Sequence, residues 1–572
     1  MKPRHYNRRK TKLLFMMMLA VFLLLFGRLI YVMVIRSDYY LIRAEQVEER
    51  ERKIKALRGN IYDRNGTALA LNQSVCTVSV IHNQVTEPEK VIDTLSDILD
   101  MDEDQVRARV EKVSSIEKIK SNVPKALGDK IRACRLDGVN VDEDYARYYP
   151  YGDLASKVIG FTGGDNQGII GLEVKYDKYL SGTEGRLLTK TDVRGVEVEN
   201  EAEKRENPIP GAHLNTSIDY NIQSFAAQTA EKILEQKEAA GVSIILMNPQ
   251  NGEIYALVDA PEFDLNMPYE LHAALPEGVS KNDALNLMWR NGCINDTYEP
   301  GSTFKIVTST AALEENVVSL TDSFSCPGFR IVEDRRIRCH KTAGHGSETF
   351  EQGFMNSCNP VFMDVGARVG AANMYKYFRR LGLFEKTGVD VPGESSSIMH
   401  KQEDIGAVEL ATISFGQSFQ ITPLQLLRAV SAVINGGTLV TPHFGVSIES
   451  EAGEIIKTFE YETKPGAVSS KTSETMKMLL EKVVSEGTGK NAKIEGYSIG
   501  GKTATSQKLP RGSGRYIASF LGFWPADHPC IIGLVMIDEP KGTYYGGTIA
   551  APVMLEIYEN VLPYLEDKRA LQ

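Results

Sequence analysis

A serine and a lysine three residues apart are the residues of this sequence best suited to chemistry. Ser302 and Lys305 follow the break Pro300-Gly301, and the apolar run 304–313 predicts that a buried helix begins here. Residues three apart share a helix face, so we expect the Lys305 amine beside the Ser302 hydroxyl. A serine becomes nucleophilic when a base takes its proton, and a lysine screened from water can be that base. The helix start adds free N–H groups that favour a developing negative charge.

The Ser-x-x-Lys pattern alone is weak evidence, because it also arises by chance. A second copy, Ser115 and Lys118, lies in a charged stretch with no Pro-Gly break before it and no apolar helix after it. Chemistry at Ser302 therefore requires that other motifs converge on it.

A first supporting motif is Ser357-Cys358-Asn359, between two helical patterns. A hydroxyl and an amide separated by one residue can both point into a cleft from a short connector. There they can relay a proton and hold a substrate amide.

A second supporting motif is the run from Gly500 to Thr505 at the start of a predicted strand. Strand alternation places Thr503 and Thr505 on one face and Lys502 on the other. The two hydroxyls and the nearby ammonium suit a substrate carboxylate. We expect Gly500 and Gly501 to let another backbone approach closely.

Size and charge limit the classes of protein that this chain can represent. With 572 residues the chain exceeds one hydrophobic core, so we expect two or more domains. Its net charge of −10, with no basic block beyond the N-terminus, argues against binding of nucleic acid.

The seven cysteines have no repeating spacing, and their odd number argues against a disulfide framework. A disulfide between Cys326 and Cys339 across a loop is one interpretation. A zinc site formed by Cys326, Cys339, His340 and His345 is another. No pair of these residues sits on a recognisable helix or ribbon, so we attribute their grouping to chance and expect no metal.

The N-terminus predicts a membrane anchor. Six basic residues precede an apolar run, 13–35, that is interrupted only by Arg28. The run is long enough to span a bilayer, the basic flank favours the cytoplasm, and no small-x-small cleavage site follows. We expect Arg28 to extend toward the membrane interface, with a contact to a partner helix as the alternative.

The remaining pattern indicates an α+β protein. Residues 39–55 predict a helical stalk, 87–136 predict charged helices, and the acidic linker 197–210 marks the main domain boundary. After Gly211 the sequence predicts a helix, a hairpin, a largely helical stretch to residue 435, three strands and a final helix (223–238; 242–247 with 253–258; 497–507, 519–524, 530–537; 550–562). Strands at both ends imply one antiparallel sheet sandwiched by helices.

In this order, Ser302-x-x-Lys305, Ser357-x-Asn359 and Lys502-Thr503 resemble the serine acyltransferase motifs of penicillin-binding proteins and class A β-lactamases. Further stretches resemble the pedestal and transpeptidase domains of class B, monofunctional penicillin-binding proteins (Arg58-Gly59, Asp63 to Gly66, Arg147 to Pro150, Gly168 to Glu173; Phe415 to Gln417, Thr422-Pro423, Tyr545 to Gly547, Ala550 to Pro552). The resemblance implies a cytoplasmic tail, an anchor, a mixed α/β pedestal, a transpeptidase domain with a five-stranded antiparallel sheet, and a C-terminal tail (1–12, 13–35, 36–205, 206–565, 566–572).

The function that the resemblance implies is peptidoglycan D,D-transpeptidation. Ser302 would form the acyl-enzyme and Lys305 would accept its proton, while Ser357 and Lys502 would handle the leaving-group proton. Substrate would be bound by Asn359, Thr503 and Thr505, with an oxyanion hole formed by the backbone N–H groups of Ser302 and Thr505. No cofactor or metal is implied.

The resemblance also implies partners and a location. The ligands would be peptidoglycan stem peptides and β-lactams. A membrane-embedded glycosyltransferase and other division or sporulation proteins would be the protein partners. The protein would be single-pass in the cell membrane, with its N-terminus cytoplasmic and its catalytic domain outside. We favour septal work over elongation from the pedestal motifs.

Position 504 departs from the family pattern, which has glycine after Lys-Thr where this chain has Ala504. Strand alternation places this methyl on the Lys502 face, so we expect it to be tolerated. Another Lys-Thr pair, Lys341-Thr342, precedes the Ser-x-Asn motif and lies in a polar loop, so we do not assign it to the site.

Two other functions fit part of this pattern. Water as acceptor would give a D,D-carboxypeptidase or a β-lactamase, although such a hydrolase needs no pedestal. A sensor or scaffold that binds β-lactams without turnover is the second alternative, although such a sensor needs a larger cytoplasmic segment.

Overall fold

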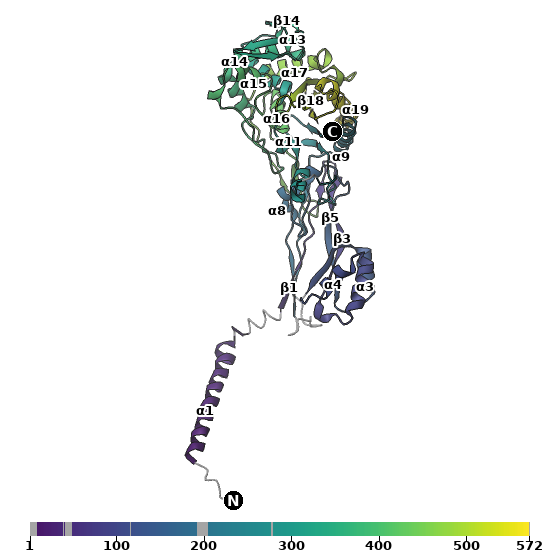
Figure 1. Ribbon diagram of the computed structural model, residues 1–572, viewed down its shortest axis with the longest axis vertical. Coiled ribbons are helices and arrows are strands. Elements are labelled where there is room, and N and C mark those ends of the chain that lie inside the picture. Colours follow the sequence, from purple (N-terminus) through teal and green to yellow (C-terminus); the bar gives the residue numbers. More distant parts are fainter. Residues whose placement is uncertain are drawn as a thin grey trace. The chain divides into compact units, whose positions relative to one another are not determined.

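The computed structural model describes residues 8–37, 39–40, 49–114, 116–190, 204–275 and 278–570 (Figure 1). Ser115 and half of the expected linker 197–210 (residues 197–203) lie outside these residues. The chain forms two compact units. The first comprises residues 1–57, 74–146 and 182–210, and the second comprises residues 58–73, 147–181 and 211–572. The second unit therefore includes segments on the N-terminal side of the expected boundary.

Among the described residues, one helix is long and apolar enough to cross a membrane. It comprises α1 (Arg8–Ile30) and a π-helical turn, η1 (Tyr31–Ile35), and its mean hydropathy reaches 2.6. The Arg28 guanidinium lies 5.3 Å from the centre of the Tyr31 ring, which covers part of its charge. The predicted helical stalk is wrong at its end, where β1 (Glu49–Ile54) pairs with β6.

Besides α1, the described part of the first unit contains two sheets and three α-helices. One sheet has the order β1-β6-β7, and in the other the second half of β3 pairs with β4. The helices α3, α4 and α5 agree with the predicted helices, whereas the prediction missed β4 because lysines alternate with its buried Ile119 and Val123. The bounds are β3 Ala68–Val80, η2 His82–Gln84, α3 Pro88–Leu99, α4 Glu103–Val110, β4 Glu117–Pro124, α5 Lys125–Ala133, β5 Val139–Tyr148, β6 Gly185–Lys190 and β7 Lys204–Glu206.

In the second unit, a small sheet joins segments that are far apart in sequence. Strand β2 pairs with the start of β3 and runs parallel to β8, and β15 connects β8 to β16. Three short helices, α6, α7 and α8, belong to the same unit. The bounds are β2 Ile61–Tyr62, α6 Ser156–Ile159, α7 Gly171–Lys175, α8 Asp177–Leu180, β8 His213–Thr216, β15 Gly445–Glu449 and β16 Ile455–Thr458.

A buried ionic network connects three of the family-like motifs of this unit. The Glu173 carboxylate accepts hydrogen bonds of 2.6 Å from both Arg58 Nε and Arg147 Nε. Arg58 also donates to the Asp177 carboxylate at 2.7 Å. Arg58 and Glu173 are completely buried, so each charge depends on the others for stabilisation.

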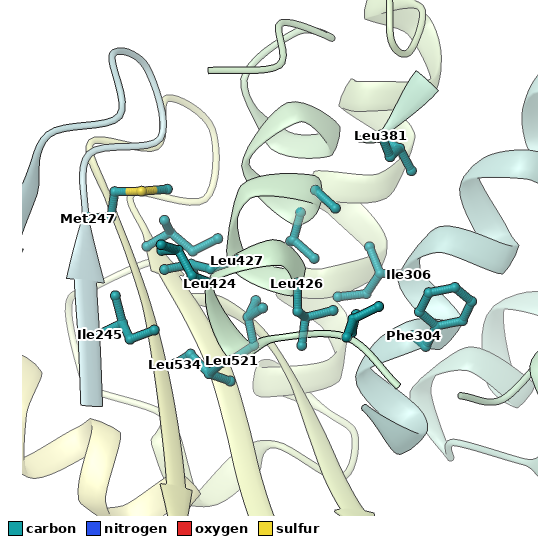
Figure 2. Packing of buried hydrophobic residues seen from close by; sticks show 14 of the residues in the cluster. Ile245, Met247, Phe304, Ile306, Leu381, Leu424, Leu426, Leu427, Leu521 and Leu534 are labelled. Carbon is teal, nitrogen blue, oxygen red and sulfur yellow. The ribbon is translucent and has the colours of Figure 1, made fainter. Parts of the chain in front are cut away.

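The expected five-stranded antiparallel sheet is present, and its strand order is β10-β9-β19-β18-β17. Alternate residues of β9 face opposite helical layers: Ile244 packs with α9 and α19, and Ile245 packs with α12 and α16. Figure 2 shows Leu424 and Leu427 of α16 on this second side, near Ile245 of the sheet. The bounds are α9 Tyr220–Gln236, β9 Gly241–Met247, β10 Ile254–Ala260, β17 Gly500–Gln507, β18 Tyr516–Trp524, β19 Ile531–Asp538 and α19 Ala551–Ala570.

The segment between the hairpin and the closing strands is helical, but it contains two ribbons that the sequence analysis missed, β11–β14 and β12–β13. Each of these strands has four residues, too few for a clear period-two pattern. The bounds are α10 Lys281–Met288, α11 Gly292–Asn295, η3 Gly301–Phe304, α12 Lys305–Glu314, β11 Ser323–Cys326, β12 Phe329–Val332, β13 Arg335–Arg338, β14 Gly346–Thr349, α13 Phe350–Met355, α14 Asn359–Arg380, η4 Gln402–Asp404, α15 Ala407–Ile413, α16 Pro423–Ile434, α17 Ser470–Ser485, η5 Lys490–Ala492 and α18 Gly546–Ile549.

Candidate active site

Ser302 lies in η3, a 3-10 turn that leads directly into the buried helix α12. Two glycines make this turn possible. Gly301 has φ +58°, and Gly416 has φ +86° and accepts a 2.9 Å hydrogen bond from the Gly301 N–H. A Cβ on Gly416 would lie 2.0 Å from the Gly301 carbonyl oxygen, so any side chain there would displace the turn that carries Ser302.

Lys305 is completely buried at the start of α12 and donates hydrogen bonds to the Ser-x-Asn motif. Its Nζ lies 2.6 Å from the Ser357 carbonyl oxygen, 3.2 Å from Ser357 Oγ and 2.8 Å from Asn359 Oδ1. These three acceptors match the three donors of an ammonium group. The Ser-x-x-Lys and Ser-x-Asn motifs are therefore joined through Lys305.

The burial of Lys305 lowers the pKa of its amine to about 8, because desolvation disfavours the charged form. Nearby Cys358, Cys339 and Glu348 oppose this effect. A lysine with this pKa is partly neutral near neutral pH, which a proton acceptor requires.

The Ser-x-Asn motif forms a tight connection between α13 and α14. Ser357 has φ +54°, a left-handed conformation that few non-glycine residues adopt. Asn359 is the first residue of α14, and its amide nitrogen donates to the Arg338 carbonyl oxygen at 3.2 Å. The turn aims the side chains of both residues at Lys305.

Lys502 is completely buried on β17, with its Nζ 5.9 Å from the centre of the Phe354 ring. Burial, and then the positive charge of Lys305, hold the pKa of Lys502 well below its usual range. Lys502 does not line the cavity described below, unlike Thr503 and Thr505. It therefore lies behind the strand surface that a substrate would meet.

The two threonine hydroxyls of β17 lie at the cavity. Thr503 Oγ1 donates to Thr488 Oγ1 at 3.1 Å, and Thr505 Oγ1 accepts a hydrogen bond from the Gly546 N–H at 3.0 Å. The hydroxyl proton of Thr505 remains available to a ligand. Ala504 faces the Ser302 turn: a Cβ placed on Gly301 would lie 3.6 Å from the Ala504 methyl.

The expected close approach of another backbone occurs at Gly501 but not at Gly500. A Cβ on Gly501 would lie 2.7 Å from the Leu521 carbonyl oxygen and 2.6 Å from the ring of Phe520, whereas one on Gly500 would lie 2.2 Å from the ring of Phe523. Both glycines therefore permit the close packing of β17 on β18.

A cavity of about 440 Å³ brings the predicted residues together. Ser302, Ser357, Asn359, Thr503 and Thr505 all line it. Several other lining residues are not assigned to the active site from the sequence: His340, Thr488, Lys490, Asn491, Tyr516 and Tyr544. No sequence pattern marks most of these residues as part of the site, because they come from loops and from the ends of strands. Only their positions in the folded structure identify them.

An ion pair that the sequence analysis missed supports the Ser302 turn. Arg511 donates to both carboxylate oxygens of Glu299 at 2.7 and 2.6 Å, and Glu299 also accepts the Ser418 N–H at 2.9 Å. Glu299 precedes Ser302 by three residues and is buried, so this contact holds the segment that enters the turn.

The cysteines near the site differ from the expectation. Cys326 and Cys339 are free thiols rather than a disulfide. They form one buried group with His345 and Cys358, and the four ligand atoms lie within 4.8 Å of one another. The argument that no pair lies on a ribbon is wrong, because Cys326 ends β11 and pairs with Gly346 of β14, beside His345. His340 lines the cavity instead.

The fold and the site together define a class of protein. A family model described as "Penicillin binding protein transpeptidase domain" matches residues 242–559, and one described as "Penicillin-binding Protein dimerisation domain" matches residues 53–216. The chain belongs to the penicillin-binding protein transpeptidases.

Particular relatives agree with this class. Stage V sporulation protein D of Bacillus subtilis is 39% identical over 97% of this chain and 86% of the relative. The peptidoglycan D,D-transpeptidase FtsI of Escherichia coli is 28% identical over 94% of this chain and 89% of the relative. Penicillin Binding Protein 2X from Streptococcus thermophilus shares the fold, with a TM-score of 0.74 at 22% identity over 90% of this chain and 80% of that structure.

Proposed function

We propose that this protein is a peptidoglycan D,D-transpeptidase that works through an acyl-enzyme on Ser302. The observation that carries the proposal is that three separated motifs meet at one cavity. Ser302 lines this cavity, and the buried Lys305 donates hydrogen bonds to both Ser357 and Asn359. A nucleophile, a base of lowered pKa and polar groups for substrate binding suit acyl transfer.

The first half of the reaction is acylation. Ser302 Oγ attacks the carbonyl carbon of the penultimate D-Ala while its proton passes to neutral Lys305. The backbone N–H groups of Ser302 and Thr505 stabilise the oxyanion. The C–N bond then breaks, and terminal D-Ala leaves with a proton relayed through Ser357. Lys502, buried behind the strand, assists this proton transfer.

The second half of the reaction is transfer to an acceptor. The amine of a neighbouring stem peptide attacks the Ser302 ester and loses a proton, and Ser302 recovers its hydroxyl proton. Asn359 holds the acylated stem. The Thr503 and Thr505 hydroxyls act earlier: they bind the terminal carboxylate of the donor stem before acylation, and this carboxylate leaves with D-Ala. A β-lactam follows the first half only, because its ring-opened product stays on Ser302.

The test is mass spectrometry of the full chain in detergent after incubation with benzylpenicillin. We expect a long-lived covalent adduct that peptide mapping assigns to Ser302, and none on Ser302→Ala. The thermal melt of this variant should match that of the wild type. An adduct on Ser115, or labelling of the variant, would falsify the assignment.

Product analysis with stem peptides separates this function from hydrolysis. A transpeptidase joins the donor to an acceptor amine, whereas a carboxypeptidase releases only D-Ala and the shortened stem. A sensor or scaffold would show an adduct but no turnover of peptide. We expect cross-linked product.

We also propose a cytoplasmic N-terminus, an external catalytic domain and a membrane-embedded glycosyltransferase as partner. The basic residues before the apolar helix support this orientation. The dimerisation-domain match over residues 53–216 accounts for the segment between the apolar helix and the transpeptidase domain, which supports a separate polymerase. Lipid II given to the purified protein alone should yield no glycan polymer, and a polymer would exclude this division of labour.

A further inference from the structure

Three cysteines and a histidine form a group that includes Cys358, the middle residue of the Ser-x-Asn motif. Cys326, Cys339 and Cys358 are buried. Their sulfur atoms and a ring nitrogen of His345 all lie within 4.8 Å of one another. Three soft sulfur ligands and an imidazole form one of the common ligand sets of structural zinc. We propose that this Cys3His cluster (Cys326, Cys339, His345 and Cys358) binds one Zn²⁺ ion.

The distances within the cluster fit a tetrahedral ion. With Zn–S near 2.3 Å and Zn–N near 2.0 Å, a sulfur and a nitrogen ligand of a tetrahedral ion lie about 3.5 Å apart. His345 Nδ1 lies 3.6 Å from Cys326 Sγ and 3.7 Å from Cys339 Sγ. These two nitrogen–sulfur separations are therefore close to those that such an ion requires, and every other pair of ligand atoms lies within 4.8 Å.

The four ligands come from three parts of the fold: the β11–β14 ribbon, the end of β13, and the turn between α13 and α14. Cys326 ends β11, and His345 precedes β14, the strand that pairs with β11. Cys339 follows β13, and its N–H donates to the Gly328 carbonyl oxygen at 2.9 Å. Cys358 comes from the turn between α13 and α14. One ion would tie both ribbons to the motif that contacts Lys305.

A buried carboxylate beside the cluster is a second, independent observation. Glu348 Oε2 is buried without a hydrogen-bond partner among the described residues and lies 3.9 Å from His345 Nδ1. Its other oxygen accepts a 2.6 Å hydrogen bond from Asn356 Nδ2. An unpaired buried carboxylate is costly, and a nearby Zn²⁺ ion would attract this oxygen, although three thiolates and one Zn²⁺ give the complex a net charge of −1.

Four protein ligands leave no open coordination position, so the ion is structural rather than catalytic. Cys358 lies between Ser357 and Asn359, whose side chains Lys305 holds at 3.2 and 2.8 Å. Metal bound at Cys358 would fix the left-handed turn at Ser357 and thereby position both side chains. Cys358 is a positioning residue in this proposal.

The test begins with metal analysis of the full chain, purified in detergent without a metal-binding tag. We expect about one zinc per chain in the wild type and less than about a tenth of that in Cys326→Ser. Cys293→Ser is the matched control, because Cys293 is equally buried but lies outside the cluster, and it should retain its zinc. Ser302→Ala should also retain it, which separates this proposal from the proposed reaction.

Cobalt exchange tests the geometry in the wild type, so it does not depend on the folding of any variant. Co²⁺ at this site should give the intense visible bands of a tetrahedral thiolate complex. The proposal is overturned if wild-type protein contains no zinc and also shows no such spectrum with Co²⁺. It is also overturned if Cys326 and Cys339 form a disulfide in protein purified without oxidant.

Metal removal tests the positioning role of Cys358. Metal-free protein should melt at a lower temperature and react with penicillin about tenfold to a hundredfold more slowly, because small displacements of reacting groups cost that much. Restored zinc should restore both properties. An unchanged acylation rate in metal-free protein would show that the ion does not position the motif.

Discussion

The amine of Lys305 lies 2.6 Å from the carbonyl oxygen of Ser357, 52 residues further along the chain. Together with the contacts to Ser357 Oγ and Asn359 Oδ1, this bond occupies all three donors of the protonated amine. Lys305 can accept the proton of Ser302 only after it loses a proton and one of these hydrogen bonds. Its protonation state therefore controls the first step of the proposed reaction.

The first prediction concerns pH. Because burial lowers the pKa of Lys305 to about 8, the neutral base predominates above that pH and the protonated, inactive form below it. The second-order rate of acylation by a fluorescent penicillin should rise about tenfold per unit below the pKa and level off above it. A thermal melt at each pH is the control for unfolding. A flat profile from about pH 6 to 9 would exclude Lys305 as the titrating base.

The second prediction concerns the hydroxyl of Ser357. Ser357→Ala keeps a Cβ on the left-handed residue and removes only Oγ, so the fold should remain and acylation should slow by about a hundredfold or more. Ser309→Ala is a matched control on α12, because its buried hydroxyl has no hydrogen-bond partner among the described residues. Stopped-flow acylation rates give both values. Equal rates for the two variants would contradict a role for Ser357 in proton transfer.

The third prediction concerns Ala504, the residue that departs from the family pattern. Its methyl is buried and faces the Ser302 turn without crowding it, because even a Cβ added to Gly301 would lie 3.6 Å away. Ala504→Gly should therefore change the acylation rate by less than about tenfold, which is about 1.4 kcal/mol in the barrier. A much larger gain in the glycine variant would mean that the methyl holds the native turn in a slow conformation.

The fourth prediction compares two carboxylates that have similar hydrogen bonds but different burial. Glu173 accepts two 2.6 Å bonds from arginines in a buried site, whereas Glu89 accepts bonds of 2.7 and 2.8 Å from Arg107 at the surface. Glu173→Gln leaves buried arginine charge uncompensated and should lower the free energy of unfolding by about 3–5 kcal/mol. Glu89→Gln should leave the free energy of unfolding nearly unchanged, because solvent screens this surface pair.

Chemical unfolding of the full chain in detergent measures both variants. Because Glu173 and Glu89 lie in different compact units, each effect is read from the transition of its own unit. Similar effects for the two variants would show that burial does not decide the strength of these ion pairs.

Much of the fold and site follows from local pattern. Strands such as Ile531–Asp538 are continuous apolar runs, and the helix after Ser302 is apolar on all sides, so both were predicted close to their observed bounds. The motif residues were recognised by type and order. Their convergence, in contrast, depends on tertiary packing that brings α12, the α13–α14 turn and β17 to one cavity.

The sequence analysis failed where contacts are long-range or elements are short. Cys358 is 13 residues from His345, and the hairpin β11–β14 that carries Cys326 has four-residue strands. No local period connects these residues, so their grouping appears only in three dimensions. The salt bridge between Glu299 and Arg511, 212 residues apart, was missed for the same reason.

The composition of the second unit has a consequence for genetic exchange between related proteins. Ile61, Phe161 and Leu172 come from the segments that precede Gly211, yet they belong to the same hydrophobic core as Phe304 and Ile306. A recombination junction near residue 211 would combine halves of one core that were selected in different parents. Mosaic genes with this junction should therefore yield less stable proteins than mosaics that also inherit residues 58–73 and 147–181 from the parent of the catalytic domain.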